Sequence, residues 1–189
     1  MSEAPICFAG NAVSGRGGQG EFLRQMVFAL DQLPHGRIIS RGAQANRAGC
    51  IDVPFAGWRS MSFRAIASTP VLRRRRDLLT WISDVDFDSR LSARADDAGL
   101  LDAVMGQCCR TFELLRERNI PLVLTALNTH IDDLAELLAD ENRRLQIDLP
   151  TFIHPRMRLR VRREIECAWR IRAVSELVKR SFVDRCVKP

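Results

Sequence analysis

The sequence has no tyrosine, few aromatic residues and no long hydrophobic run. Without tyrosine, a Tyr-x-x-x-Lys catalytic pair is impossible. The longest strongly apolar run, residues 120–127, falls far short of the roughly 20 residues that a membrane-spanning helix needs. The first residues, MSEAPICF, contain no basic region followed by a long apolar stretch, so no secretory signal is expected. We therefore expect a soluble, cytoplasmic protein.

Motifs for metal ions and nucleoside triphosphates are also missing. The six cysteines include no C-x-x-C pair and no paired Cys/His cluster, so we expect no metal site. Without an export signal, a disulfide framework is not expected either. No G-K-[ST] follows the glycine-rich segment, which excludes a Walker A loop. Cys108 and Cys109 open a predicted helix, where a thiolate would be stabilised, but small buried residues are the favoured interpretation.

Basic charge is concentrated at the end of the chain. Residues 156–189 contain eleven basic and four acidic residues, a balance of +7 within a formal net charge of +6. This segment could attract phosphates, nucleic acid or an anionic membrane, and a solvated helix face explains it equally well. No nucleic-acid motif accompanies it, so no specific nucleic-acid partner is expected. Four arginines at 73–76 lie among apolar residues; a solvated helix is favoured there over contact with the inner membrane face.

Apolar patterning predicts a single α/β domain over residues 1–189. With 46% hydrophobic and 28% charged residues, the composition is that of a globular protein and argues against disorder. Strands are predicted at 5–9, 37–40, 101–106, 121–127 and 170–174. Helices are predicted at 21–33, 62–82 with an interruption near Pro70, 108–118, 131–145, 155–169 and 175–187, with a loop at 44–58 and an unassigned polar stretch at 83–98. Strands alternating with helices imply a Rossmann-like parallel sheet with helices on both faces.

A glycine-rich segment, NAVSGRGGQG, links the first strand to the first helix. Its peptide N–H groups and the helix N-terminus favour a phosphate or another anion. Gly15, Gly17 and Gly20 satisfy the dinucleotide pattern G-x-G-x-x-G, but residues 11–14 separate them from the predicted strand, and no carboxylate follows the second strand. Arg41 lies there instead and could fit a 2′-phosphate, which leaves NADP binding open. A loop that only reverses the chain is the remaining alternative.

Two further positions follow predicted strands. His130 comes just after the clearest strand, at the edge where ligands bind in open α/β sheets, so a functional role and a helix-capping role are equally supported. Asp132 and Asp133 suit the first turn of the next helix, where they complement the dipole. Ser175 and Glu176 follow the last strand, and capping by Ser175 is enough to explain them structurally. The same pair could face a ligand at the carboxyl edge of the sheet.

Three motifs together resemble the acceptor-side domain of family 4 glycosyltransferases. They are SGRGGQGEFLRQMVFAL after the first strand, LNTH ending at His130, and EIECAWRIRAVSELVKRSF near the end of the chain. The last is similar to the family pattern E-x-x-x-A-D-x-(I/V)-x-x-x-S-E-x-x-x-x-x-(F/L), with Trp169 where the family has Asp. The resemblance covers nearly the whole chain and implies one half of a GT-B architecture, in which two Rossmann domains face each other.

The resemblance also implies roles for individual residues. The segment with Gly15, Arg16, Gly17 and Gly18 would bind substrate, with Gly17 and Gly18 near the donor diphosphate and the acceptor. His130 would contact the transferred sugar as the catalytic residue. Ser175 and Glu176 would line the inner cleft less directly. The reaction would be transfer of a sugar from a nucleotide-sugar donor with retention of configuration, with no metal or other cofactor.

The E-x7-E carboxylates that hold the donor in this family do not occur in the sequence. We therefore expect a donor-binding domain to be absent from residues 1–189, to be supplied by a partner chain or further sequence, and the chain alone to be catalytically silent. Two alternatives stay open. One is a small NADP-dependent oxidoreductase, based on the glycine pattern and Arg41. The other is a non-enzymatic module that binds anions through its basic residues.

Overall fold

The computed structural model describes residues 4–30, 32–33, 35–42, 49–54, 69, 75–147 and 153–185. Its elements are β1 (Ile6–Val13), α1 (Gly17–Leu30), β2 (Gly36–Arg41), β3 (Cys50–Asp52), α4 (Arg76–Arg94), β4 (Leu100–Val104), α5 (Cys109–Glu117), β5 (Leu122–Ala126), α6 (Ile131–Arg144), α7 (Pro155–Cys167), β6 (Arg170–Ala173) and α8 (Glu176–Asp184). The six strands form one all-parallel sheet in the order β3-β2-β1-β4-β5-β6. This confirms the predicted α/β, Rossmann-like fold.

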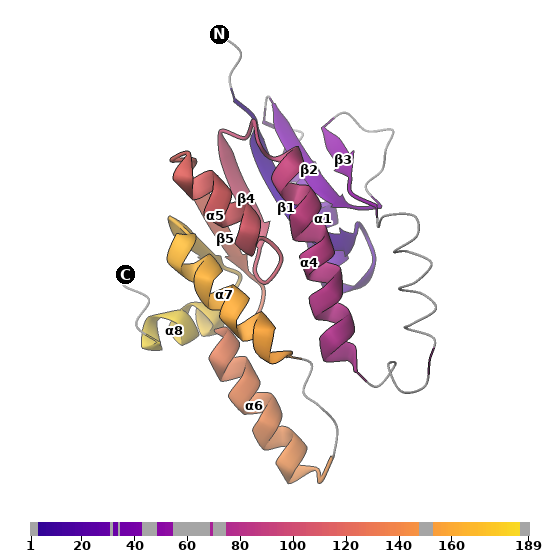
Figure 1. The fold of residues 1–189 in the computed structure, drawn as a ribbon, viewed down its shortest axis with the longest axis vertical. Coiled ribbons are helices and arrows are strands. Elements are labelled where there is room, and N and C mark those ends of the chain that lie inside the picture. Colours follow the sequence, from indigo (N-terminus) through magenta and orange to yellow (C-terminus); the bar gives the residue numbers. More distant parts are fainter. Residues whose placement is uncertain are drawn as a thin grey trace.

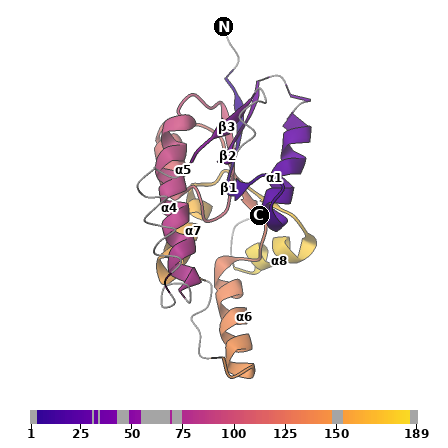
Figure 2. The same ribbon diagram turned by 90° about the vertical axis from the view of Figure 1, so that its right-hand side faces the viewer.

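Helices cover both faces of the sheet (Figures 1 and 2). α4, α5 and α7 form one layer, in which α5 packs against both of its neighbours. α1 and α8 lie on the opposite face, while α6 extends away from the carboxyl edge of the sheet. The larger hydrophobic core lies beneath the three-helix layer around Phe87, Leu91 and Phe112. A smaller core beneath α1 contains Phe8 and Leu23.

The strands form where short apolar runs were predicted to be buried. Leu101, Leu122 and Leu124 are almost completely enclosed, because both faces of a parallel sheet are covered. β3 was missed: Cys50–Asp52 falls inside the predicted loop 44–58. It spans only three residues directly after Gly49, too few to give an alternating pattern, and its pairing with Ile38, Ile39 and Ser40 of β2 defines it.

α4 is longer than its apolar pattern suggested. Most of its length coincides with the polar stretch 83–98, for which the sequence predicts no element, and only its beginning with the predicted helix 62–82. The pattern was obscured because this helix turns aspartates, including Asp84, Asp86 and Asp88, toward the protein interior. Residues 62–68 and 70–74 of that predicted helix, with two of the four consecutive arginines, lie outside the described residues.

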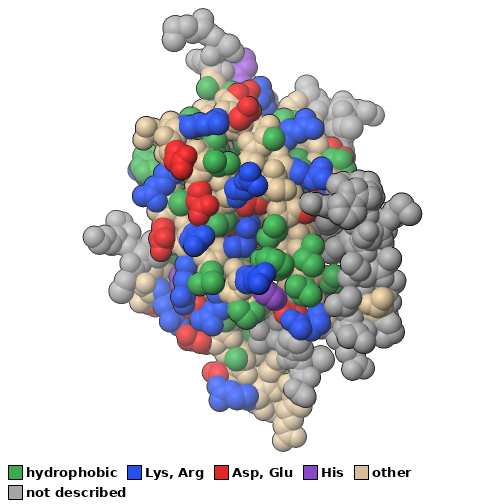
Figure 3. All heavy atoms as spheres, viewed as in Figure 1, with side chains coloured by type: hydrophobic (Ala, Val, Ile, Leu, Met, Phe, Trp, Pro, Cys, Tyr) green, Lys and Arg blue, Asp and Glu red, His purple; other side chains and the backbone are tan. Residues whose placement is uncertain are grey.

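The basic segment is largely neutralised within the fold. On α7, Arg158 and Arg162 both pair with Asp132, while Arg160 pairs with Asp88. Figure 3 shows basic and acidic side chains interspersed over the face that α4, α5 and α7 form. These contacts support the interpretation of a helix whose charges are balanced locally over that of a dedicated anion-binding surface. Within the described residues, no helix has the length and apolar character needed to cross a bilayer.

The two glycines Gly18 and Gly20 provide a matched test of backbone packing. A Cβ at Gly20 would lie 2.2 Å from the carbonyl oxygen of Val13, whereas a Cβ at Gly18 would meet nothing within 4 Å. We expect Gly20→Ala to lower the free energy of unfolding by about 1–3 kcal/mol through overpacking. Gly18→Ala should be neutral or stabilising by up to about 1 kcal/mol, because alanine favours helix. Urea unfolding of both variants measures the difference, and equal stabilities would contradict this close approach.

Candidate functional site at the carboxyl edge of the sheet

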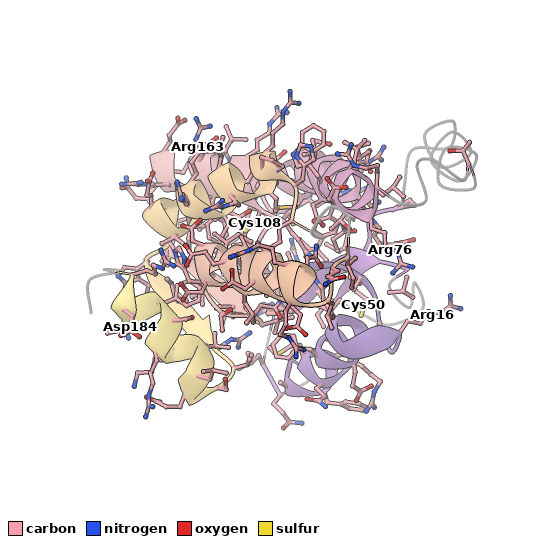
Figure 4. The ribbon with its side chains drawn as sticks, turned by 90° about the horizontal axis from the view of Figure 1, so that it is seen from below. Arg16, Cys50, Arg76, Cys108, Arg163 and Asp184 are labelled. Atoms are coloured by element: carbon pink, nitrogen blue, oxygen red, sulfur yellow. The ribbon has the colours of Figure 1, made fainter. Side chains whose placement is uncertain are left out.

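The strand order places a topological switch point between β1 and β4. From β1 the chain moves outward to β2 and β3, whereas from β4 it moves in the other direction to β5 and β6. In open α/β sheets of this order, ligands bind beyond the carboxyl ends of the strands at this point. Figure 4 looks onto this edge of the molecule, with Arg16 near the start of α1. The glycine-rich segment and the turn after β4 therefore form the first candidate site.

The glycine-rich turn presents an open helix N-terminus. Gly15 and Gly17 have positive φ values of 79° and 68°, a conformation that glycine adopts at little cost. The first N–H groups of a helix lack intrahelical partners. Among the described residues, no side chain accepts a hydrogen bond from the N–H groups of Gly17 or Gly18, and both residues are exposed. This end of α1 can therefore receive an anion.

The turn follows its strand more closely than the sequence suggested. We expected residues 11–14 to separate the first strand from the glycines and the helix to begin at Glu21, but β1 runs to Val13 and α1 begins at Gly17. The pairing of β1 with β2 shifts register between Gly10 and Val13, which lets the strand continue past its apolar run. With Gly20 packed on the strand, the three glycines occupy a strand-turn-helix geometry suited to a diphosphate.

Asn11 holds the end of β1 in place. Its side-chain nitrogen donates to Asp84 Oδ1 at 2.6 Å and to Ser83 Oγ at 2.9 Å, while its side-chain oxygen accepts from Arg41 Nε. Burial raises the pKa of Asp84 to about 7, against the opposing effects of the Asn11 hydrogen bond, Arg160 and Arg41. This buried network anchors the strand from which the glycine turn departs.

Arg41 is committed to the same network. Its guanidinium is buried, donates to the carbonyl oxygens of Val53 and Ser83, and pairs with Asp86 at 3.1 Å. Burial lowers its pKa, and the carboxylate of Asp86 opposes that shift. An arginine enclosed in this way cannot reach a ligand phosphate outside the sheet. The structure therefore removes the feature that favoured NADP in the sequence.

Gln107 joins the two strands of the switch point. It lies on the turn after β4, and its Oε1 accepts the backbone N–H of Asn11 at 2.6 Å. The same oxygen accepts from Nε2 of Gln19, in the first turn of α1, at 3.0 Å. The side chain is 7% exposed. One buried amide thus connects the end of β1, the start of α1 and the turn after β4.

The corresponding N-terminus of α5 is closed by the protein's own carboxylates. Asp88 accepts the N–H groups of Arg110 and Thr111, at 2.8 and 3.0 Å. Glu164 of α7 accepts the N–H groups of Gly106 and Cys108, and its pKa is raised by burial to about 8 despite these bonds. The first N–H groups of α5 are consequently not available to a ligand, in contrast to those of α1.

His130 is both a helix cap and a buried imidazole with one free nitrogen. Its Nδ1 accepts the N–H of Asp132 at 3.3 Å, its backbone N–H donates to Ser181 Oγ, and its ring lies edge-on to Phe182. Burial lowers the pKa of His130, although Asp132 and Asp133 oppose the shift. The imidazole is therefore neutral at pH 7 with its proton on Nε2. Among the described residues Nε2–H has no partner, so it can donate to a ligand.

Ser175 and Glu176 lie at the edge strand, away from the glycine turn. Ser175 caps α8 by accepting the N–H of Val178 at 3.2 Å, as its structural interpretation predicted. Glu176 is exposed and pairs weakly with Lys179 and Arg180 of its own helix. Because β4 and β5 lie between β1 and β6, the pair is not brought together with Gly15 to Gly18. The pair is joined to His130 through α8, which carries Ser181 and Phe182.

Cys108 and Cys109 are buried, with raised pKa values. Cys108 is fully buried with a pKa raised well above its ordinary value, mainly by burial and then by Glu164. Burial likewise raises the pKa of Cys109 to about 12. The favoured interpretation of small buried residues is confirmed for this pair. In the part of the chain that the structure describes, no three His, Cys, Asp or Glu side chains are placed to hold a metal ion.

Sequence reasoning missed the polar residues that build the switch point. Asn11, Gln19 and Gln107 are neutral amides, and nothing in their spacing distinguishes them from surface residues. Asp88 and Glu164 are separated by a long stretch of chain, although both lie opposite the same helix end. The available signal was positional: Asn11 and Gln107 follow the apolar runs of neighbouring strands.

Comparison of the chain with models of known protein families finds no family that matches, and comparison with curated proteins finds no match.

Proposed function

We propose that this chain is the acceptor-side half of a retaining glycosyltransferase that uses a nucleotide-sugar donor. The observation that carries the proposal is the exposed N-terminus of α1 at the switch point, with the N–H groups of Gly17 and Gly18 unpaired by any described side chain. The equivalent end of α5 is filled by Asp88 and Glu164. Of these two helix ends, the start of α1 is the one open to a diphosphate, and it lies where the sequence resembles family 4 enzymes.

In this proposal the residues that contact the donor lie after the ends of two strands, the glycine turn after β1 and His130 after β5. The N–H groups of Gly17 and Gly18 would donate hydrogen bonds to the donor diphosphate. As the bond from the sugar to this diphosphate breaks and the bond to the acceptor oxygen forms, the leaving phosphate oxygen would take the proton of the acceptor hydroxyl. His130 donates from Nε2 to the transferred sugar and stays neutral because burial lowers its pKa. A neutral donor suits a sugar hydroxyl, since it adds no charge that the sugar would have to compensate. Gly15 and Arg16 support the turn, and Ser175 and Glu176 begin the helix behind His130.

Exposed apolar side chains support a docking face for a donor-binding domain. Val13 at the end of β1, Val174 after β6 and Leu177 in the first turn of α8 are 38%, 47% and 71% exposed. All three lie at or after the carboxyl ends of strands, Val13 beside the glycine turn and the other two at the edge strand, with β4 and β5 between them. A domain that docks across this edge of the sheet would cover all three. Cytoplasmic location and contact with the inner membrane face stay predictions.

The alternative of an NADP-dependent oxidoreductase loses its specific support. The glycine geometry suits any diphosphate, whereas the choice of NADP depended on Arg41. That guanidinium is enclosed by Asn11, Asp86 and backbone carbonyls. A non-enzymatic anion-binding module is likewise weakened, because the arginines of α7 pair with carboxylates.

A transfer assay tests the proposed function. Purified residues 1–189 should transfer no labelled hexose from UDP-, GDP- or ADP-sugars to glycoside acceptors, because half of the aligned binding site is missing. Transfer should appear when a donor-binding Rossmann domain with the E-x7-E carboxylates is supplied, on the same chain or as a partner. Transfer by residues 1–189 alone would overturn the proposal.

Two substitutions of His130 separate its capping role from its proposed role in the reaction. His130→Asn keeps a good N-cap and should hold the free energy of unfolding to within about 1 kcal/mol of the original, but it removes Nε2. We expect the completed enzyme to lose at least about tenfold in kcat/KM, the effect of losing one hydrogen bond of roughly 1.4 kcal/mol. His130→Ala should additionally lose about 1 kcal/mol of stability with the cap. An unchanged kcat/KM in His130→Asn would show that the residue only caps α6.

A further inference from the structure

Gln107 has an orientation that the backbone dictates. The N–H of Asn11 points at its side chain from 2.6 Å and requires an acceptor, so Oε1 of Gln107 faces Asn11. Nε2 of Gln19 then donates to the same oxygen at 3.0 Å. These two bonds occupy both lone pairs of Oε1. The amide therefore cannot be turned around without leaving the Asn11 N–H facing another donor.

The unused atoms of the two amides are complementary. Among the described residues, Nε2 of Gln107 and Oε1 of Gln19 have no hydrogen-bond partner. Gln107 is 7% exposed, but its Nε2 atom is not completely enclosed. In the described part of the chain, the completely enclosed side-chain atoms without a hydrogen-bond partner are Ser40 Oγ, Arg90 Nε and Arg160 Nε. A buried amide whose donor group still reaches the surface is costly unless a ligand or water completes it. The two amides, joined at 3.0 Å through their other atoms, thus offer one unused donor and one unused acceptor.

We propose that Gln107 and Gln19 bind a hydroxyl group of a neutral polyhydroxyl acceptor, such as a sugar. A hydroxyl accepts from Gln107 Nε2 and donates to Gln19 Oε1 at the same time. A carboxylate or phosphate only accepts, so it would face the oxygen of Gln19 unfavourably, and an ammonium only donates. The charged groups on the protein side are already paired with each other, since Arg41 pairs with Asp86 and binds Asn11.

The positions of the two amides place this hydroxyl beside the reacting groups. Gln19 lies in the first turn of α1, one residue after Gly18, and Gln107 lies on the turn after β4. The hydroxyl would therefore sit between the two strands of the switch point, next to the N–H groups assigned to the diphosphate. Arg16, the cation of the turn, extends outward from the start of α1 (Figure 4). Only the identification of this ligand as the acceptor rests on the proposed function; the preference for a neutral hydroxyl does not.

Titration of the complete 189-residue chain, followed by ¹H–¹⁵N NMR, tests the assignment. The probes are the methyl α-glycosides of glucose, mannose and galactose, with succinate as an acceptor-only comparison. We expect at least one glycoside to shift the side-chain NH₂ resonances of Gln107 and Gln19 saturably in the millimolar range, and succinate to leave them in place. No glycoside response, or a response to succinate instead, overturns the proposal.

A matched pair of substitutions identifies the donor group. Gln107→Glu keeps an acceptor for Asn11 and Gln19 but removes the NH₂ group, and we expect glycoside affinity to fall at least about tenfold. Gln25→Glu makes the same change at an exposed position on α1 and should have no effect. Unfolding curves check that both variants fold. If Gln107→Glu does not fold, Gln19→Leu is tested in its place. That variant removes the acceptor, and we expect the same loss of glycoside affinity. Equal affinities in the original and variant chains overturn the proposal.

A parallel titration with UDP separates this inference from the proposed function. UDP that shifts the backbone N–H resonances of Gly17 and Gly18 while every glycoside is silent would overturn the inference and leave the glycosyltransferase proposal standing. Glycosides that shift the Gln107 resonances without any response to UDP would support the inference and count against a donor site at the glycine turn.

Discussion

Replacing Asp88 with alanine is expected to lower the free energy of unfolding by about 3–5 kcal/mol, the range for breaking a buried, hydrogen-bonded ion pair. The carboxylate is almost completely buried and accepts four hydrogen bonds, from the N–H groups of Arg110 and Thr111, the Thr111 hydroxyl and Nη2 of Arg160. Its removal leaves the start of α5 uncapped and the Arg160 guanidinium without its partner. Guanidinium chloride unfolding followed by circular dichroism measures the change.

Asp96→Ala is the control for this substitution. Asp96 lies in the exposed turn after α4, and among the described residues its carboxylate has no partner. We expect a change within about 0.5 kcal/mol, as for other surface positions. A loss of less than about 1 kcal/mol in Asp88→Ala would contradict the role of Asp88 as the cap of α5.

Stability should also fall as the pH rises from 6.5 to 8.5. Burial raises the pKa of Glu164 to about 8 and that of Asp84 to about 7. In the unfolded chain these carboxyls ionise near pH 4, so over this interval the folded protein holds protons that the unfolded chain has released. Their contribution to stability is complete below pH 4 and is lost as the pH passes through 7 and 8. We expect a loss of about 2–3 kcal/mol.

A variant isolates the contribution of Glu164 to this decrease. The lowered pKa of His130 acts in the opposite direction, since unfolded histidine binds a proton more strongly, but that effect fades above about pH 7. Burial raises the pKa values of the Cys7, Cys108 and Cys109 thiols, which adds to the decrease toward pH 8.5 in every variant. Glu164→Gln cannot ionise, so the decrease between pH 6.5 and 8.5 should be smaller by about 2 kcal/mol in this variant. Unfolding free energies from urea titrations at four pH values give the comparison. A stability that is constant or rises over this interval would contradict the raised pKa values.

The fold could be predicted where apolar patterning and burial agree. Residues 121–127 gave β5 because a parallel strand between two helical layers is apolar on both sides. The second half of α4 could not be predicted, because Asp84 and Asp88 occupy inward positions that a hydrophobic pattern reserves for apolar residues. Their burial is possible only because Asn11, Arg160 and the α5 backbone satisfy them, and such partners are not visible along the chain.

In the candidate site, too, features set by the local sequence could be predicted, whereas features that depend on distant residues could not. Gly15, Gly17 and Gly20 could be found from the sequence because backbone conformation and close packing restrict residue choice locally. Arg41 was assigned a possible phosphate contact from its position after β2, but whether its side chain turns inward depends on Asp86 of α4. The role of Gln107 could not be predicted, because it depends on a hydrogen bond to Asn11 that forms only when the fold brings the ends of β1 and β4 together.

A ¹H–¹⁵N titration of the chain with UDP, GDP and ADP, repeated with Gly18→Val, tests whether the glycine turn binds a diphosphate. A Cβ at Gly18 meets nothing within 4 Å, so valine there leaves the fold intact and places bulk over the exposed N–H groups of α1. We predict that at least one diphosphate shifts the resonances of residues 15–18 in the original chain, and that Gly18→Val abolishes the response. No response at these residues to any of the three nucleotides, or an undiminished response in Gly18→Val, would contradict a diphosphate site at the glycine turn.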